Sequence, residues 1–146
     1  MIDPPEPLPA AASRGILDTS TVILLQRLTD PTALPAESLI TAVTLAELSV
    51  GPLLTDDPVE REARQAHLQQ AEADFDPIPF DSASARAFGA VAASLRRSGR
   101  KATARAYDAM TAAIAIANDL PVFTCNPVGF VGIDGLEVVA VPVPEL

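Results

Sequence analysis

The chain has 146 residues, 49% of them hydrophobic, which is enough for one domain with a hydrophobic core and excludes a wholly disordered chain. Its formal net charge of −9 argues against a protein that binds nucleic acid through its overall electrostatic field. One cysteine, Cys125, and one histidine, His67, exclude an internal disulfide framework and a metal site made of several cysteines or histidines.

The amino-terminal segment is rich in proline and carries acidic rather than basic residues, so we do not expect a secretory signal peptide there. We expect residues 1–13 to form a flexible, proline-rich tail and residues 14–146 to form a single domain. No apolar run is long enough to span a bilayer, so an integral membrane protein is not expected.

Short apolar segments alternate with longer helical patterns along the rest of the chain. The expected strands are residues 15–18, 38–43, 121–124 and 136–141. The expected helices are residues 19–28, 44–51, 58–75, 82–99 and 103–118. Strands that alternate with helices predict an α/β fold with a parallel sheet that is covered on both faces.

Three of the expected helices carry further signals. Asp57-Pro58 is typical of a helix start, with a capping aspartate followed by proline at the first helical position. Residues 103–118 are apolar on nearly every side, which predicts a helix buried in the centre of the protein. On residues 82–99, the helical spacing predicts an inner face made of Ala85, Phe88, Ala92 and Leu95.

Polar residues occur where the predicted strands end, at the edge that carries the functional crevice in open α/β sheets. Asp18 follows the first strand, and Thr124 and Asn126 follow the third. Glu47 lies one helical turn beyond the second strand, and Asp108 lies near the start of the most apolar helix. Carboxylates that converge without lysine partners indicate a hard divalent cation, Mg²⁺ or Mn²⁺.

Each of these residues also has a purely structural interpretation. Asp18 could cap the helix that follows it, and Asp108 could be a first-turn acid stabilised by the helix dipole. Glu47 fits a capping box that begins at Thr44, in which the glutamate returns to the backbone N–H of the capping residue. Asn126 precedes a proline, a pair that is common in turns.

Half of the basic residues lie within ten positions of one another. They are Arg96, Arg97, Arg100, Lys101 and Arg105. Either they form a local patch that contacts RNA phosphates on an otherwise acidic protein, or they are a solvated helix end whose cations suit the helix dipole.

Four sequence blocks, taken together and in order, carry a resemblance to a known family. They are Leu-Asp-Thr-Ser, Thr-x-Ala-Glu-Leu-x-x-Gly, Tyr-Asp-Ala-x-x-Ala-Ala-x-Ala and Val-Phe-Thr-Cys-Asn-x-x-x-Phe. Over residues 15–141 the chain resembles the PIN-domain nucleases, and most closely the VapC toxins of bacterial toxin–antitoxin pairs.

The resemblance implies a three-layer α/β/α sandwich and a ribonuclease that uses Mg²⁺ or Mn²⁺ to hydrolyse RNA phosphodiesters, leaving a 5′-phosphate and a 3′-hydroxyl. Carried over by position, the catalytic residues are Asp18, Glu47, Asp108 and Asn126. The three acids are the metal ligands, and Ser20 and Thr124 support them.

The resemblance also implies a bacterial cytoplasmic protein that forms a homodimer and is neutralised by a small VapB-type antitoxin. The apolar helices at residues 19–28 and 44–54 offer a groove for an amphipathic helix of that partner. An arginine of the antitoxin would match the acidic pocket, because its fork of donors fits a carboxylate.

Two departures from the family pattern keep other functions open. Many relatives have arginine at the position of Cys125 and an acid near Gly129, so a catalytically weakened PIN fold that only binds RNA or protein is the alternative. A phosphatase with an aspartyl nucleophile is disfavoured because Ser20 stands where a second aspartate is needed. The chain has no glycine-rich phosphate loop of the P-loop NTPases.

Overall fold

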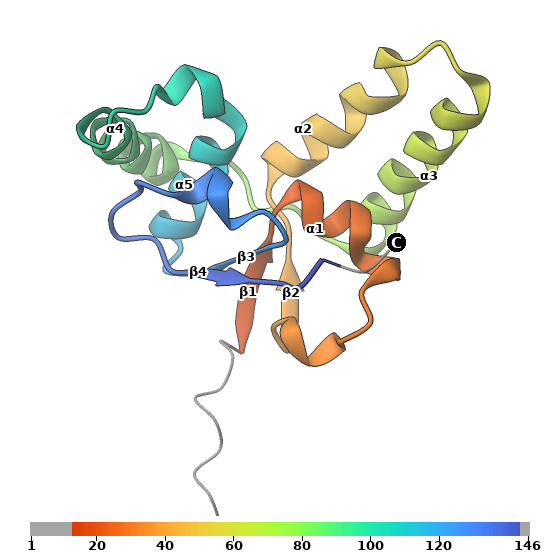
Figure 1. Cartoon of the computed structure of the whole chain (residues 1–146), viewed down its shortest axis with the longest axis horizontal. Helices are drawn as coiled ribbons and strands as arrows, with labels where there is room; N and C mark the ends of the chain where they lie inside the picture. Colours follow the sequence, from red (N-terminus) through yellow and green to blue (C-terminus); the bar gives the residue numbers. More distant parts are fainter. Residues whose placement is uncertain (1–12, 144–146) are drawn as a thin grey trace, which may run out of the picture.

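The structure, a computed structural model, describes residues 13–143, so the tail expected at residues 1–13 lies outside this range apart from Ser13. A four-stranded sheet forms the centre of the domain (Figure 1), in the order β2-β1-β3-β4. The strands are β1 (Arg14–Leu17), β2 (Glu37–Leu39), β3 (Val122–Thr124) and β4 (Val138–Ala140). Each neighbouring pair is parallel, which confirms the parallel sheet expected from the sequence.

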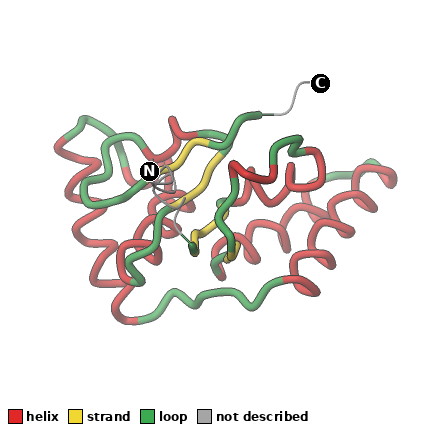
Figure 2. Tube along the Cα trace, turned by 90° about the horizontal axis from the view of Figure 1, so that it is seen from below, coloured by secondary structure: helices red, strands yellow, loops and turns green. Residues whose placement is uncertain are grey.

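Helices lie on both sides of the strands, as Figure 2 shows, and complete the expected three-layer α/β/α sandwich. They are α1 (Thr19–Leu24), α2 (Ala42–Val50), α3 (Pro58–Asp74), α4 (Ser82–Arg97) and α5 (Ala106–Ala117). Among the helices of the described range, none combines the length and apolar character that crossing a membrane requires.

The two faces of the sheet are buried in separate parts of the core. Ile16 and Val122 belong to the part formed with α4 and α5, whereas Leu17 and Phe123 pack with apolar residues of α1 and the segment after it. Successive residues of a strand point to opposite faces, so a strand covered on both sides reads as an uninterrupted apolar run. This explains why the strands could be recognised from short apolar segments.

Helix α5 is the central helix that the sequence predicts. Five consecutive or near-consecutive residues on it have no exposed surface: Ala109, Ala112, Ala113, Ile114 and Ala115. Their small side chains allow α5 to lie close to α4 and to the sheet, in one continuous apolar cluster. The first turn of α5, which carries Asp108, is thereby fixed in position next to the carboxyl ends of the strands.

The second strand is shorter than predicted, and the helix after it begins earlier. β2 ends at Leu39, and Thr41 rather than Thr44 is the capping residue of α2, because its side chain accepts the backbone N–H of Thr44 at 3.3 Å. Thr41 also forms an isolated parallel bridge with Ile78. This contact with a distant segment fixes Thr41 in extended conformation, and the helix starts directly after it.

The inner face of α4 also differs from the prediction. Leu95 is buried and Phe88 packs against the core, as predicted, but Ala85 is exposed, and the other buried residues are Ser84, Val91 and Ser94. The two serines are buried because their hydroxyls are paired: Ser84 donates to the carboxylate of Asp81, and Ser94 donates to the carbonyl of Gly132. Counting only apolar residues overlooked these two serines, and the predicted face had Ala92 in place of its buried neighbour Val91.

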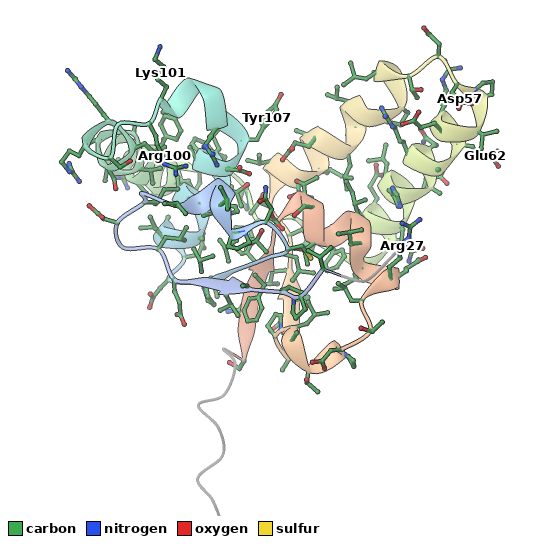
Figure 3. All side chains as sticks on the ribbon, viewed as in Figure 1. Arg27, Asp57, Glu62, Arg100, Lys101 and Tyr107 are labelled. Atoms are coloured by element: carbon green, nitrogen blue, oxygen red, sulfur yellow. The ribbon has the colours of Figure 1, made fainter. Side chains whose placement is uncertain are left out.

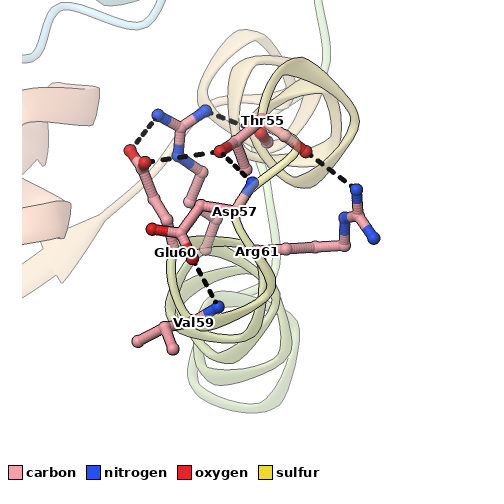
Figure 4. A network of polar contacts seen from close by, with 7 residues as sticks. Thr55, Asp57, Val59, Glu60 and Arg61 are labelled. Atoms are coloured by element: carbon pink, nitrogen blue, oxygen red, sulfur yellow. Dashed lines mark hydrogen bonds and ion pairs between the residues drawn. The ribbon is translucent and has the colours of Figure 1, made fainter.

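The start of α3 confirms the Asp57-Pro58 signal. The Asp57 carboxylate accepts the backbone N–H of Val59 at 3.0 Å, while its own N–H donates to the hydroxyl of Thr55 (Figure 4). Arg61 reaches back to the Thr55 carbonyl at 2.9 Å. The turn before α3 is thus tied to the helix on two sides.

Gly15 in β1 provides a test of this packing. A Cβ at Gly15 would lie 2.5 Å from Cε1 of Phe123 and 3.2 Å from Cγ of Pro35, and Phe123 is fully buried. We expect Gly15→Ala to lower the free energy of unfolding by about 1–3 kcal/mol. Urea unfolding measures this effect.

The matched control is Gly89→Ala in α4, where a Cβ would meet nothing within 4 Å. There the substitution removes backbone freedom from the unfolded chain, so we expect it to raise the free energy of unfolding by about 0.5–1 kcal/mol. Equal effects of the two substitutions would contradict the close contact at Gly15.

Candidate active site

Asp18 lies directly after β1, and only 6% of its surface is exposed. Its Oδ1 accepts the hydroxyl of Thr21 at 2.6 Å and the Thr21 backbone N–H at 3.2 Å. Its Oδ2 accepts the hydroxyl of Thr124 at 2.8 Å, and the Ser20 hydroxyl lies 3.0 and 3.1 Å from the two oxygens. Asp18 therefore caps α1, as its structural interpretation proposed. Its carboxylate is also held at the edge of the sheet by three hydroxyl donors.

Thr124 and Asn126 form a corner where β3 ends. The Thr124 hydroxyl donates to Asp18 and accepts the backbone N–H of Asn126 at 2.9 Å. The carbonyl of Asn126 accepts the N–H of Gly129 at 3.1 Å, so the turn predicted at Asn126 is present. The side chain of Asn126 is exposed and does not cap the short helix that follows it. The structure thus brings Thr124 to Asp18 and leaves the Asn126 amide open to solvent.

Glu47 lies on α2 and is half-buried. One of its oxygens accepts the hydroxyl of Thr19 at 2.8 Å, and that hydroxyl lies 2.9 Å from the hydroxyl of Thr44. The capping box expected between Thr44 and Glu47 is wrong, because Thr41 caps α2 and Thr44 is a buried residue within the helix. Glu47 is therefore free of a capping role and faces the start of α1.

Asp108 lies in the first turn of α5 and is half-buried. A Cβ added at Gly129 would lie 2.7 Å from its Oδ2 and 3.8 Å from a guanidinium nitrogen of Arg105. Gly129 therefore leaves the space that the Asp108 carboxylate fills.

The pKa values of two of the carboxylates, Glu47 and Asp108, are raised above their ordinary values. Burial raises the pKa of Glu47, the Thr19 hydroxyl lowers it, and the charges of Asp108 and Asp18 raise it. Burial also raises the pKa of Asp108, and the charge of Asp18 adds to this effect while Arg105 opposes it. The three acids named by the sequence thus share one electrostatic environment.

This environment suits a divalent cation in charge and in donor type, since a cation would relieve the repulsion and oxygen is the ligand atom that Mg²⁺ prefers. As the side chains stand in residues 13–143, no three acidic, histidine or cysteine side chains are grouped closely enough to hold one ion. Two of the acids, Glu47 and Asp108, lie on helices that face the fixed Asp18.

The basic cluster is divided by the structure. Arg96 and Arg97 lie in the exposed last turn of α4, where Arg97 pairs with Asp134 at 3.1 Å. Lys101 projects away from the domain (Figure 3). Arg105 instead lies near Asp108 and donates to the carbonyl of Val128 at 2.9 Å. The helix-end interpretation fits the first two residues, and Arg105 is the member that adjoins the acids.

Sequence patterns did not single out Thr21, which binds Asp18 most tightly. It has no exposed surface and lies directly before the apolar residues of α1. The available signal was the order Asp-x-x-Thr at a helix start, where the fourth residue can donate back to the capping acid.

Comparisons with known proteins identify the fold and the family. The PIN domain family matches residues 16–135. Ribonuclease VapC5 of Mycobacterium tuberculosis is 37% identical over 123 residues, which are 83% of this chain and 88% of that protein. A chain in the crystal structure of VapBC-5 from the same organism, a member of the VapBC family of toxin–antitoxin systems, is 34% identical. It has a TM-score of 0.76, with 88% of this chain and 99% of that chain covered.

The crystal structure of DNA-bound VapBC from Salmonella typhimurium has the same fold, with 24% identity and a TM-score of 0.69 over 86% of this chain and 96% of that chain. The chain belongs to the PIN-domain family. Within that family it is a VapC-like protein, which confirms the resemblance drawn from the four sequence blocks.

Charge repulsion in the site leads to a prediction for the metal-free protein. We expect Asp108→Asn to raise the melting temperature at pH 7 in the presence of a chelator, because it removes one of three facing charges. Since the pKa of Asp108 is raised in the folded chain, the wild type loses stability as the pH rises from the ordinary value of 3.8 to the raised one, and regains none above it.

The advantage of the asparagine should therefore vanish as the pH falls below 3.8, and thermal unfolding at several pH values measures it. Asp56→Asn is the matched control, because Asp56 is exposed on the turn before α3. A lower melting temperature of Asp108→Asn at pH 7 would show that the charge of Asp108 is stabilised by a partner.

Proposed function

We infer that the chain is a metal-dependent endoribonuclease toxin of the VapC kind. The observation that carries this proposal is the electrostatic coupling of three acids from three different elements: the charge of Asp18 raises the pKa of both Glu47 and Asp108, and the charge of Asp108 raises that of Glu47. Carboxylates placed so that they repel one another are costly for the fold, and a function that binds a cation accounts for this cost. Ribonuclease VapC5, at 37% identity, supports the same activity.

Asp18, Glu47 and Asp108 would hold the Mg²⁺ or Mn²⁺ ion. When bound, such an ion acidifies a water molecule and polarises the scissile phosphate. Asp18 is oriented by its hydroxyl donors, so its oxygens are fixed before substrate arrives. Glu47 uses one oxygen to accept from Thr19, which leaves the other to orient the attacking water. One histidine cannot supply both an acid and a base, so we expect products with a 5′-phosphate.

Substitution of the two half-buried acids tests this assignment. We expect Asp108→Asn and Glu47→Gln each to lower the rate of RNA cleavage about a hundredfold or more. Glutamine retains the oxygen that accepts from Thr19, so the fold around it should persist. The assay follows a labelled RNA oligonucleotide with Mg²⁺ and with a chelator, and Asp56→Asn serves as the active control.

Wild-type cleavage that continues in the chelator would contradict the metal requirement, and full activity of Glu47→Gln would remove that residue from the site. If the wild type binds the oligonucleotide without cutting it, the weakened PIN-fold binding module is the correct function. Cys125 and Gly129 are the departures from the family pattern that favour this alternative.

RNA contact is the second part of the proposal, and Arg105 is the cation placed to make it. Its guanidinium lies beside Asp108, so a phosphate that reaches the acids also reaches Arg105. Arg96, Arg97, Arg100 and Lys101 would contact the flanking strand, where an extended RNA passes the end of α4.

We expect Arg105→Gln to weaken binding of a single-stranded RNA in the presence of a chelator and to reduce the salt dependence of log Kd by about 0.7, the value for one released counterion. Arg14→Gln is the control, because that guanidinium is paired with Glu37 in an exposed position at the start of β1, the end of the strand away from Asp18. A larger loss of affinity in Arg97→Gln than in Arg105→Gln would place the RNA path along α4 alone.

The third part of the proposal is a small antitoxin partner, because VapBC-5 of Mycobacterium tuberculosis is a member of a family of toxin–antitoxin systems. A groove between α1 and α3 is lined by apolar residues, which include Val22, Leu25, Ala66 and Phe75, and by polar ones, which include Arg27, His67 and Asp74. The sequence predicted residues 44–54 as the second wall of the antitoxin groove, whereas α3 provides the second wall of this one; binding of an antitoxin helix there stays a prediction. The homodimer, the arginine of the antitoxin and the cytoplasmic location stay predictions.

A further inference from the structure

The hydroxyl of Thr21 joins two parts of the site that are far apart in sequence. It donates to Oδ1 of Asp18 at 2.6 Å and accepts the backbone N–H of Cys125 at 3.0 Å. A second acceptor, the carbonyl of Phe123, lies 3.4 Å away, so the single proton of the hydroxyl goes to the nearer carboxylate. Thr21 has no exposed surface, and no water competes for these bonds.

Thr124 repeats this arrangement on the other oxygen of the same carboxylate. Its hydroxyl donates to Oδ2 of Asp18 at 2.8 Å and accepts the N–H of Asn126 at 2.9 Å. Each oxygen of Asp18 thus receives one threonine hydroxyl, and each hydroxyl receives one of two successive N–H groups after β3. The direction of the Asp18 carboxylate and the path of residues 125–126 are fixed by the same two side chains.

Ser84 shows how a hydroxyl at this helix position looks when it serves only as a cap. It is fully buried, three residues after the capping Asp81 of α4, and both its N–H and its hydroxyl donate to Oδ1 of Asp81 at 2.9 Å. The bonds of Thr21 to Asp18 have the same local pattern. The bond from Cys125, across 104 residues, is what Thr21 has in addition.

We propose that Thr21 is a positioning residue of the active site, which holds the Asp18 carboxylate in line with the corner at residues 124–126. This inference rests on the proposed nuclease function. The Thr21 hydroxyl is bonded both to a carboxylate and to a backbone N–H, so the three groups form one polar network. Removing one member of such a network displaces the others. An error of about 1 Å at a reacting group costs about a hundredfold in rate, so a positioning effect is measurable.

Three variants of the full chain test the proposal. Thr21→Val keeps the shape and removes the hydroxyl, Thr21→Ser keeps the hydroxyl, and Ser84→Ala removes the matched cap hydroxyl in α4. The first measurement is the hydrogen exchange rate of the Cys125 amide, followed by NMR without metal. The second is kcat and KM for a labelled RNA oligonucleotide at saturating Mg²⁺.

We expect Thr21→Val to accelerate exchange of the Cys125 amide about tenfold relative to Ser84→Ala, and to lower kcat about tenfold or more with little change in KM. Thr21→Ser should restore both within about twofold. Comparison with Ser84→Ala separates the lost contact from a general loss of stability, because both variants lose one buried hydroxyl at a helix start.

An unchanged exchange rate of Cys125 in Thr21→Val overturns the proposal, and so does an unchanged kcat. If the wild-type chain cleaves no RNA, the proposed function fails, while the exchange measurement still decides whether Thr21 holds the corner. The two failures are therefore distinguishable.

Discussion

A buried carboxylate must have hydrogen-bond donors, and Asp18 imposes this requirement on the whole sheet edge. Its donors come from the first turn of α1 and from the end of β3, so both elements have to be in place before the charge is satisfied. The backbone N–H groups of Cys125 and Asn126 then bind the same hydroxyls. The need of one buried carboxylate for donors therefore constrains both the register of β1 beside β3 and the position at which α1 starts.

The other two acids are treated differently by the fold. Glu47 has one hydroxyl donor, and Asp108 has the guanidinium of Arg105 in its vicinity, so burial and mutual repulsion prevail for both. One carboxylate is held firmly and two are held at an energetic cost. This difference suits a site in which Asp18 defines the geometry and Glu47 and Asp108 respond to a ligand. The repulsion that these two acids experience is relieved when a positive charge binds.

Much of this architecture could be predicted from the sequence. Apolar runs located the strands and hence Asp18 and Thr124 at their ends, and the all-apolar pattern of α5 placed Asp108 near the sheet. The start of α2 could not be predicted, because Thr41 and Thr44 are both suitable caps and a contact with Ile78 decides between them. The role of Thr21 could not be predicted for a similar reason. Its partner Cys125 is 104 residues away, and local sequence patterns carry no information on such a pair.

The separation between Asp18 and its partners has a consequence for the newly made chain. The bond from Thr124 to Asp18 spans 106 residues, and the bond from Cys125 to Thr21 spans 104. The elements β1, α2 and α5 are therefore all synthesised before β3 exists. During synthesis, contacts of this length form last, because loop closure must precede them. A ribosome-bound chain that ends before residue 124 already contains the three acids. It lacks residues 124–126, which orient the Asp18 carboxylate. For a protein of the toxin class, the order of residues thus delays an assembled site until residues 124–126 have been made, which allows time for a partner to be present.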